Sequence, residues 1–375
     1  MGVSNNLRTK IISNSKIEFG FVITAVGDKG ESDSRMYKGM FADVEKGIEL
    51  GYNSAWMLEH HFSDYFPTPS PLQLLSFIAG RYPDIDLGTA VLVLPWYNPL
   101  RLAEDISLLR MVTDRTLHIG IGRGTAILEY ERFGIPNMDE TRDRFHEIID
   151  IVREATSNDT FTYEGKFHSV GLETRLRPKV DSWDNTFFYG AVGGSPESSQ
   201  IMARERLPIA CTAWGNIGAQ ETAVNSWRAE AAKNGVDIDA YKLPVMLNCI
   251  VADSDDEAID QAKQYIPIYM QAQLDHYDTH RERFEQLESY KAWGNVLKGW
   301  EARTDPDNIP EWCKGQLVGS PETCIRRAQE FVDIGFGQIV IHCSTPGVPT
   351  GPRHDWMTRF ARDVMPNIKT KAAAA

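Results

Sequence analysis

The feature that most constrains this fold is an alternation of strand-like and helix-like segments, which repeats eight times along the 375-residue chain. Short runs rich in β-branched residues alternate with longer stretches in which apolar residues recur every three or four positions. This order is typical of a parallel sheet, in which each helix returns the chain to the same end of the sheet. Eight units favour closure into a (β/α)₈ barrel over an open doubly wound sheet. The sequence therefore predicts an α/β barrel.

The individual elements are predicted from their residue patterns. Strands are expected at 17–23, 55–58, 85–94, 116–122, 186–192, 208–214, 243–252 and 338–343. Helices are expected at about 34–50, 139–156, 217–234, 320–334 and 354–365, and a long charged helical region is expected at about 254–303. Further helices begin at Ser70, Asn98 and Ser195. A barrel of this kind takes about 250 residues, and the excess falls into insertions at about 157–184 and 270–316. Nothing in the sequence reads as a linker, so residues 1–375 are expected to form a single domain.

Net charge, apolar runs and cysteine content limit the partners and the cellular compartment that the sequence predicts. The formal net charge is −13 and basic residues form no patch, which disfavours a nucleic-acid or anionic-membrane partner. Residues 1–16 lack the apolar core of a signal peptide, and no apolar run approaches the roughly 18–20 residues that a membrane span needs. The five cysteines are odd in number and include no CxxC pair, so we expect a protein of the reducing cytoplasm.

The end of the second predicted strand carries the first candidate site. The apolar run 55–58 is followed by Glu59, His60, His61 and Phe62, and in (β/α)₈ barrels the C-terminal strand ends carry the chemistry. A histidine here could transfer protons near neutral pH, although a pair of hydrogen-bonded structural histidines fits the residues equally well. Neighbours in an extended chain point to opposite faces, so His60 and His61 are not expected to share a metal ion. No HExxH or similar spacing occurs, and no metal site is predicted.

Two glycine-rich strand ends are candidate anion sites. Gly120-Ile-Gly-Arg-Gly124 is either a tight turn or a surface that lets a flat ring or a phosphate approach the backbone, with Arg123 as the anion partner. Gly193-Gly-Ser-Pro-Glu-Ser198 enters a helix N-terminus, where free N–H groups and the helix dipole attract anions. Ser-Pro also opens the helices at 70 and 320, so the second motif is equally compatible with an ordinary helix cap.

Five motifs, taken in order, resemble a known family. They are Trp56-Met-Leu-Glu-His-His-Phe62, Gly88-Thr-Ala-Val-Leu-Val-Leu-Pro95, His118-Ile-Gly-Ile-Gly-Arg-Gly124, Gly319-Ser-Pro-Glu-Thr-Cys324 and Asp363-Val-Met-Pro366. Together they make nearly the whole chain similar to the bacterial luciferase-like flavin-dependent monooxygenases, and in particular to the luciferase subunits. The resemblance implies a TIM barrel that binds reduced FMN, supplied by a separate flavin reductase, and activates molecular oxygen as a flavin C4a-hydroperoxide.

The resemblance also assigns roles to individual residues. His60 corresponds to the catalytic histidine of the family, and we expect Glu59 to orient it. The residues expected to contact the cofactor are Arg123, Ser195 and Ser198 at the phosphate, Gly194 through its backbone, and Ala90, Val91, Gly122 and Trp214 beside the flavin ring. The Ala90–Val91 bond corresponds to a non-proline cis peptide.

Two departures from the family limit what the resemblance implies. Gly122 stands where the light-emitting luciferase subunit has a reactive cysteine. Thr125 and Ala126 follow Gly124, where that subunit has an aromatic residue. Light emission and a long-chain aldehyde substrate are therefore not expected.

The resulting expectation is a two-component flavoprotein monooxygenase, an oxidoreductase that oxygenates a small organic substrate through a C4a-peroxyflavin. The resemblance also implies a homodimer formed through the second and third helices, and a loop within 270–316 that shields the flavin from water. Two alternatives stay open. One is a deazaflavin-dependent oxidoreductase on the same barrel, and the other is a flavin-binding protein without catalytic activity.

Overall fold

The computed structural model describes residues 16–27, 30–135, 137–212, 216–278, 281–284, 286, 287, 290 and 293–370. Within these ranges eight parallel strands form a closed barrel, because β8 pairs with β9 and β11 pairs with β1. In order around the barrel they are β1 (Glu18–Ile23), β2 (Ser54–Met57), β3 (Asp86–Val93), β4 (Leu117–Gly122), β7 (Thr186–Val192), β8 (Ile209–Thr212), β9 (Leu243–Val251) and β11 (Phe336–His342). The expected (β/α)₈ barrel is confirmed.

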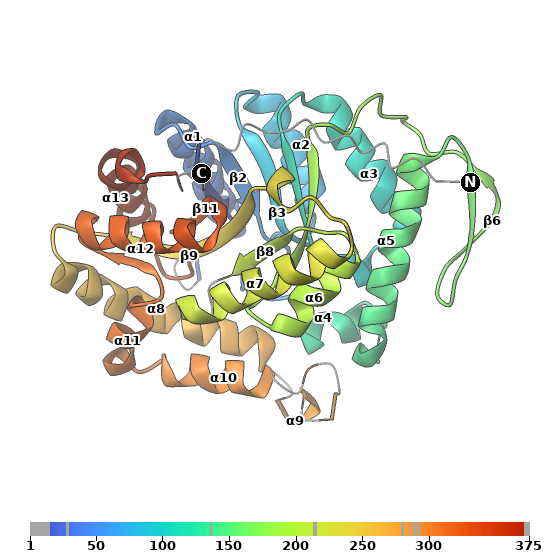
Figure 1. The fold of residues 1–375 in the computed structure, drawn as a ribbon. Coiled ribbons are helices and arrows are strands. Elements are labelled where there is room, and N and C mark those ends of the chain that lie inside the picture. The colour runs from blue at the N-terminus through green and yellow to red at the C-terminus, as the bar shows by residue number, and fades with distance from the viewer. Residues whose placement is uncertain are drawn as a thin grey trace.

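A layer of helices surrounds this barrel (Figure 1). It comprises α1 (Asp33–Glu49), α2 (Pro71–Arg81), α3 (Pro99–Val112), α5 (Thr141–Ser157), α6 (Pro196–Arg204), α7 (Ile217–Lys233), α12 (Pro321–Ile334) and α13 (Thr350–Arg359). The side chains of Asn98, Ser195 and Ser320 each accept a backbone N–H in the first turn of their helix, and proline follows each of them. These capping residues fix where three of the helices begin.

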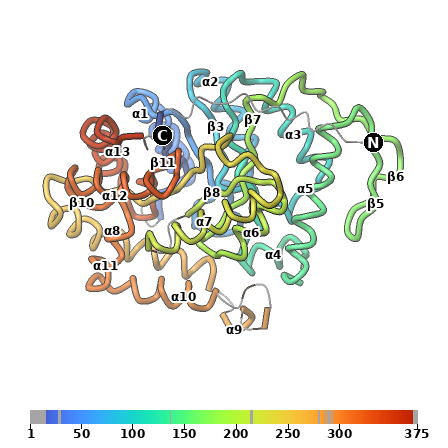
Figure 2. Tube along the Cα trace, viewed as in Figure 1, coloured from blue at the N-terminus to red at the C-terminus, as the bar shows by residue number. Residues whose placement is uncertain are grey.

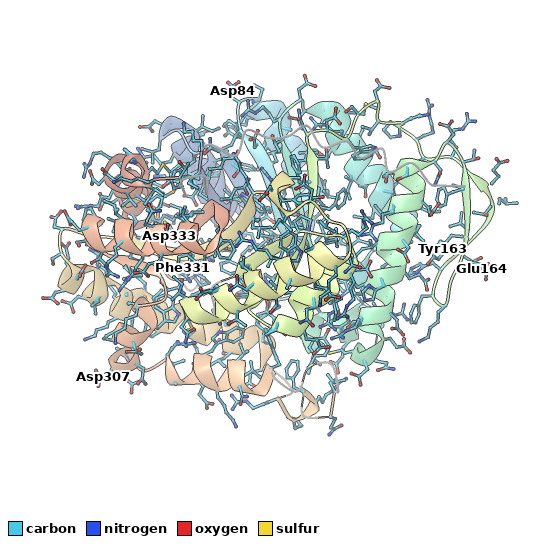
Figure 3. The ribbon with its side chains drawn as sticks, viewed as in Figure 1. Asp84, Tyr163, Glu164, Asp307, Phe331 and Asp333 are labelled. Carbon is cyan, nitrogen blue, oxygen red and sulfur yellow. The ribbon has the colours of Figure 1, made fainter. Side chains whose placement is uncertain are left out.

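The first insertion forms a hairpin of β5 (Phe161–Glu164) and β6 (Ser169–Thr174), which lies outside α5. Figure 3 shows Tyr163 and Glu164 of this hairpin at the edge of the molecule. The turn is held by Glu147 of α5, whose carboxylate accepts the backbone N–H groups of Lys166, Phe167 and His168. The sequence predicted an insertion here and not the hairpin.

The second insertion extends the helical layer after β9. It begins within α8 (Asp255–Tyr277) and continues through α9 (Arg281–Phe284), α10 (Trp293–Ala302) and α11 (Ile309–Cys313). These helices lie together at the lower edge of the tube in Figure 2. A short strand, β10 (Leu317–Gly319), then pairs with β9 outside the barrel. None of the helices that the structure describes combines the length and apolarity needed to cross a bilayer.

The interior of the barrel is filled by large rings that glycines accommodate. The Trp56 ring stacks on His118 at a centroid distance of 5.1 Å and approaches Tyr189 at 6.3 Å. A Cβ atom at Gly88 would lie 2.5 Å from Cδ2 of Trp56, and a Cβ atom at Gly20 would lie 2.9 Å from its Nε1. Glycine on both neighbouring strands therefore makes room for the tryptophan, which closes the barrel beneath the rim.

We expect Gly88→Ala to lower the free energy of unfolding by about 1–3 kcal/mol, because the added methyl group overpacks against a rigid buried ring. Gly80→Ala is the matched control: this glycine lies in α2 with open space around it, so the same change should raise stability by about 0.5–1 kcal/mol. Urea unfolding of both variants measures the difference. Equal stability of Gly88→Ala and the parent chain would contradict this account of the interior.

Candidate active site

The predicted site residues share one rim because the barrel strands run in parallel. His60 follows β2, Arg123 follows β4 and Ser195 follows β7, so all three lie at the carboxyl ends of strands. In barrels of this architecture that end carries the active site. His60, Arg123 and Ser195 therefore lie at the same end of the barrel.

A small cavity brings two of the predicted phosphate contacts together. It measures about 60 Å³ and is lined by Gly122, Arg123, Arg142, Phe145, His146, Ala191, Ser198, Ile201 and Met202. Nη1 of Arg123 is buried and has no hydrogen-bond partner among the described residues. Ser195 caps α6, and its Oγ accepts the N–H of Ser198. A buried guanidinium N–H group that lacks a hydrogen-bond partner and lies beside a helix N-terminus is suited to bind an anion.

The second insertion covers Arg123. The Tyr290 ring lies 5.2 Å from the guanidinium carbon of Arg123, and the Tyr290 hydroxyl donates to the carbonyl oxygen of Gly124 at 3.1 Å. The same hydroxyl lies 2.8 Å from Oγ1 of Thr141 at the start of α5. A segment expected to shield the site thus contacts one of its predicted cofactor residues directly.

The Ala90–Val91 peptide bond is cis, as the resemblance implied. At this point the register between β3 and β4 breaks, between Thr89 and Leu92. A Cβ atom at Gly120 would lie 2.2 Å from the carbonyl oxygen of Thr89, and one at Gly122 would lie 2.8 Å from Cγ2 of Val91. The close approach of β3 therefore accounts for both glycines of β4, independently of any role in cofactor binding.

Glu59 does not orient His60, which corrects the sequence-based prediction. Its Oε2 accepts the N–H of Val93 at 2.9 Å, and its Oε1 accepts the Tyr97 hydroxyl at 2.8 Å and lies 3.1 Å from Nε2 of His61. The alternation of an extended chain turns Glu59 and His61 to one side and His60 to the other. Glu59 instead ties the end of β2 to the end of β3.

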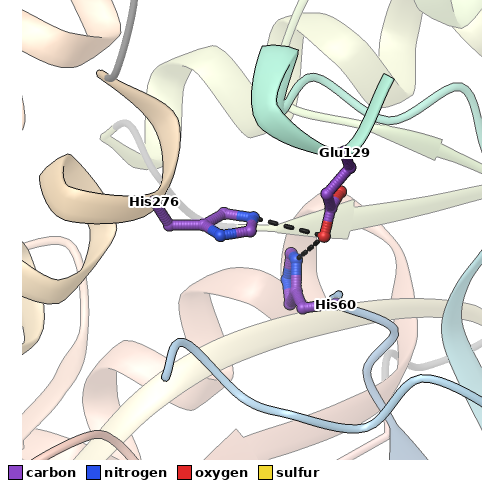
Figure 4. Close-up of side chains that lie close together, drawn as sticks. All are labelled: His60, Glu129 and His276. Atoms are coloured by element: carbon purple, nitrogen blue, oxygen red, sulfur yellow. Dashed lines mark ion pairs between the residues drawn. The ribbon is translucent and has the colours of Figure 1, made fainter. Parts of the chain in front are cut away.

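A different carboxylate faces His60. Glu129 lies on the short helix α4 (Ile127–Arg132), and its Oε1 is 3.5 Å from Nδ1 of His60 and 3.3 Å from Nε2 of His276 on α8 (Figure 4). The backbone N–H of His61 donates to the same oxygen at 2.7 Å. Glu129 and His276 are buried, and the side chain of His60 is 15% exposed.

Burial and ion pairing shift the pKa values of Glu129 and His60. Burial raises the pKa of Glu129, but its contacts with His276 and His60 outweigh that effect and bring the pKa to about 2. Burial lowers the pKa of His60, and the nearby Glu129 opposes the change. The rings of Tyr65 and Tyr277 lie 4.7 Å and 5.9 Å from the His60 ring and are among the groups that bury it.

Several residues of the site could not be identified from the sequence. Glu129 lies on a helix of six residues, too short for a periodic pattern. His276 belongs to a buried stripe of α8 that includes Tyr269 and Gln273, a pattern that predicts burial and not a role. Arg142 lies in the first turn of α5, where nothing local indicates that it borders the cavity. Trp214, predicted to lie beside the ring, is outside the described residues.

The chain is similar to several known proteins. It spans about half the length of the uncharacterized protein y4vJ of Sinorhizobium fredii, with 32% identity over 49% of this chain and 51% of that protein. It is 25% identical to the alkanal monooxygenase alpha chain of the Kryptophanaron alfredi symbiont, over 86% of this chain and 90% of the relative. It is 22% identical to the F420-dependent glucose-6-phosphate dehydrogenase of Amycolatopsis mediterranei, over 92% and 98% of the two chains.

Solved structures share the fold. The oxygenating constituent of 3,6-diketocamphane monooxygenase from Pseudomonas putida, solved in complex with FMN, superimposes with a TM-score of 0.74 at 18% identity. That comparison covers 95% of this chain and 100% of the other. A model of the luciferase-like monooxygenase family matches residues 17–338. With the family's barrel present and the family match spanning most of the sequence, this chain belongs to the luciferase-like monooxygenase family.

Proposed function

We propose that this chain is the oxygenase component of a two-component monooxygenase, which takes reduced FMN from a separate flavin reductase and oxygenates a small organic substrate. The observation that carries the flavin assignment is the cavity shared by Arg123 and Ser198, in which Nη1 of Arg123 has no partner among the described residues. The oxygenase assignment is supported by the family and by the FMN complex of a structurally similar oxygenating constituent.

The residues of the cavity fit the phosphate end of FMN. Arg123 would supply a charged donor, and the N-terminus of α6 would supply free N–H groups beyond its Ser195 cap. Arg142 also borders the cavity, although it is paired with Glu197 at 3.0 Å. The volume of about 60 Å³ suits a small anion and not a tricyclic ring, so this cavity is proposed for the phosphate alone. Contacts of Ala90, Val91 and Gly194 with the cofactor stay predictions.

When bound, reduced FMN supplies the electrons that activate molecular oxygen. The protein would position the substrate, hold a proton at His60 and keep water out. With Nδ1 of His60 directed at Glu129, Nε2 is the nitrogen that would exchange a proton with the reacting molecules. Glu129 would hold the ring in that orientation.

Water exclusion would come from the second insertion. Tyr277 of α8 packs against Trp293 and Trp300 at centroid distances of 5.8 Å and 5.4 Å, and it also packs against His60. These buried aromatic rings form an apolar cover on one side of the histidine. Such a cover matters in oxygen chemistry, because water diverts reactive intermediates to side products.

A deazaflavin-dependent oxidoreductase is the second candidate. It is favoured by the similarity to an F420-dependent dehydrogenase, which extends over 92% of this chain. A deazaflavin also carries a phosphorylated side chain, so the Arg123 cavity would suit either cofactor.

Binding and oxygen use distinguish these candidates. We expect anaerobic titration to show tight binding of reduced FMN. We also expect oxygen uptake in the presence of a flavin reductase to yield products that carry ¹⁸O from ¹⁸O₂.

His60→Ala should retain FMN affinity and lose about 10²- to 10⁴-fold in product formation. His354→Ala is the control. This histidine lies on α13 and pairs with Asp43 of α1. Tight deazaflavin binding without oxygen consumption would refute the proposal. Full activity of His60→Ala would show that His60 is not the catalytic histidine, and flavin binding by the parent chain without labelled product would favour a non-catalytic flavin-binding protein.

The phosphate assignment predicts a loss that depends on the ligand. Arg123→Ala should weaken reduced FMN binding by about 10- to 150-fold, since a hydrogen bond to a charged group contributes about 1.5–3 kcal/mol. Binding of reduced riboflavin, which has no phosphate, should change little. Arg326→Ala removes only an exposed pair with Glu330 and serves as the control. An equal loss for both flavins would show that Arg123 does not contact the phosphate.

We also propose a homodimer through α2 and α3. Phe77 of α2 and Leu108, Met111 and Val112 of α3 are about half exposed, an unusual gathering of large apolar side chains. Sedimentation velocity should show a species heavier than the 42.3 kDa chain, and Leu108→Asp should shift it to monomer. Leu172→Asp, at an exposed position of β6, should not. A parent protein that sediments as a monomer would refute the dimer.

A further inference from the structure

Three side chains of metal-binding type converge beside the barrel rim from separate parts of the chain. His60 comes from the segment after β2, Glu129 from α4 and His276 from α8 (Figure 4). One potential ligand atom of each lies within 4.8 Å of the other two. We propose that His60, Glu129 and His276 form a binding site for one divalent transition-metal ion of the zinc class.

The spacing of the ligand atoms suits such an ion. Tetrahedral zinc has bonds of about 2.0–2.1 Å to nitrogen and oxygen, which places neighbouring ligand atoms about 3.3–3.4 Å apart. Oε1 of Glu129 lies 3.5 Å from Nδ1 of His60 and 3.3 Å from Nε2 of His276. Two edges of a tetrahedron are therefore already in place. The third pair of ligand atoms, one from each histidine, lies within 4.8 Å, so the two rings would have to approach each other by up to about 1.4 Å to close it.

The two ring nitrogens are otherwise unsatisfied. Nδ1 of His60 and Nε2 of His276 are both buried and make no hydrogen bond of acceptable geometry within the described part of the chain. The His276 side chain is fully buried. A buried polar nitrogen without a partner is costly, and a shared cation would satisfy both nitrogens at once.

The surroundings support the ligands in the way that metal sites require. Oγ of Ser63 lies 2.7 Å from Nδ1 of His276, so the tautomer that donates to Ser63 leaves Nε2 free to bind a metal. The backbone N–H of His61 occupies one lone pair of Oε1 of Glu129, and the second remains available. The ligand set of two imidazoles and one carboxylate matches zinc sites that keep an open fourth position.

An ion here would join α8 to the barrel, because His276 belongs to the second insertion and His60 to the rim. Its binding should therefore stabilise the fold as well as fill the site. The competing explanation is a protonated ion pair, in which a proton on one or both rings compensates the carboxylate of Glu129. The two explanations differ in whether a stoichiometric metal is bound.

The test uses the full-length chain, free of flavin and stripped of metal with a chelator. Co²⁺ is titrated as a spectroscopic probe and then displaced by Zn²⁺, and equilibrium dialysis gives the stoichiometry. We expect one ion per chain, a visible tetrahedral Co²⁺ spectrum without thiolate bands, and a higher thermal midpoint with Zn²⁺. The measurement needs no cofactor or substrate, so its outcome does not depend on the proposed function.

Variants identify the ligands. His276→Ala and Glu129→Gln should abolish stoichiometric binding, and Ser63→Ala, which leaves all three ligands in place, should weaken it about 10- to 100-fold. His354→Ala, a histidine that also pairs with a buried carboxylate, should bind like the parent chain. If His276→Ala fails to fold, the metal affinity of Ser63→Ala still decides whether the site binds an ion. Absence of a stoichiometric ion, thiolate bands in the Co²⁺ spectrum, or equal affinity in Ser63→Ala and the parent would overturn the metal site.

Discussion

Closure of the parallel barrel is the constraint on which the rest of the structure depends. Pairing of β8 with β9 and of β11 with β1 leaves none of the eight barrel strands as a free edge of the barrel. Because every strand runs in the same direction, each strand end contributes its following residues to one rim. His60, Arg123 and Ser195 are far apart in the sequence and lie at that rim for this reason alone.

The rim is held together by buried carboxylates. Glu59 connects the end of β2 to Val93 and Tyr97 after β3, and Glu129 connects α4 to the segment after β2 and to His276 of α8. Below them, Trp56 fills the barrel between two glycine-containing strands. The barrel interior below the rim thus contains packed rings, and the rim itself is held by contacts of buried carboxylates.

The proposed phosphate site would suit more than one cofactor. A buried arginine beside a helix N-terminus is suited to a phosphate, which is the group that the two proposed cofactors, FMN and a deazaflavin, have in common. Under that proposal, selectivity between the two cofactors would come from the ring environment and from the residues that cover it. In this chain those residues belong to the second insertion, where Tyr277 packs against His60 and Tyr290 lies over Arg123.

The sequence by itself determined the barrel, most helix starts and the residues at the strand ends. These features depend on neighbours within a few positions, such as the alternation along a strand or the serine that caps α6. Only the tertiary structure decided the partners: Glu129 faces His60 where Glu59 was expected, and Arg142 borders the Arg123 cavity. Short-range patterns do not encode which distant side chains meet, because barrel closure and helix packing fix those contacts.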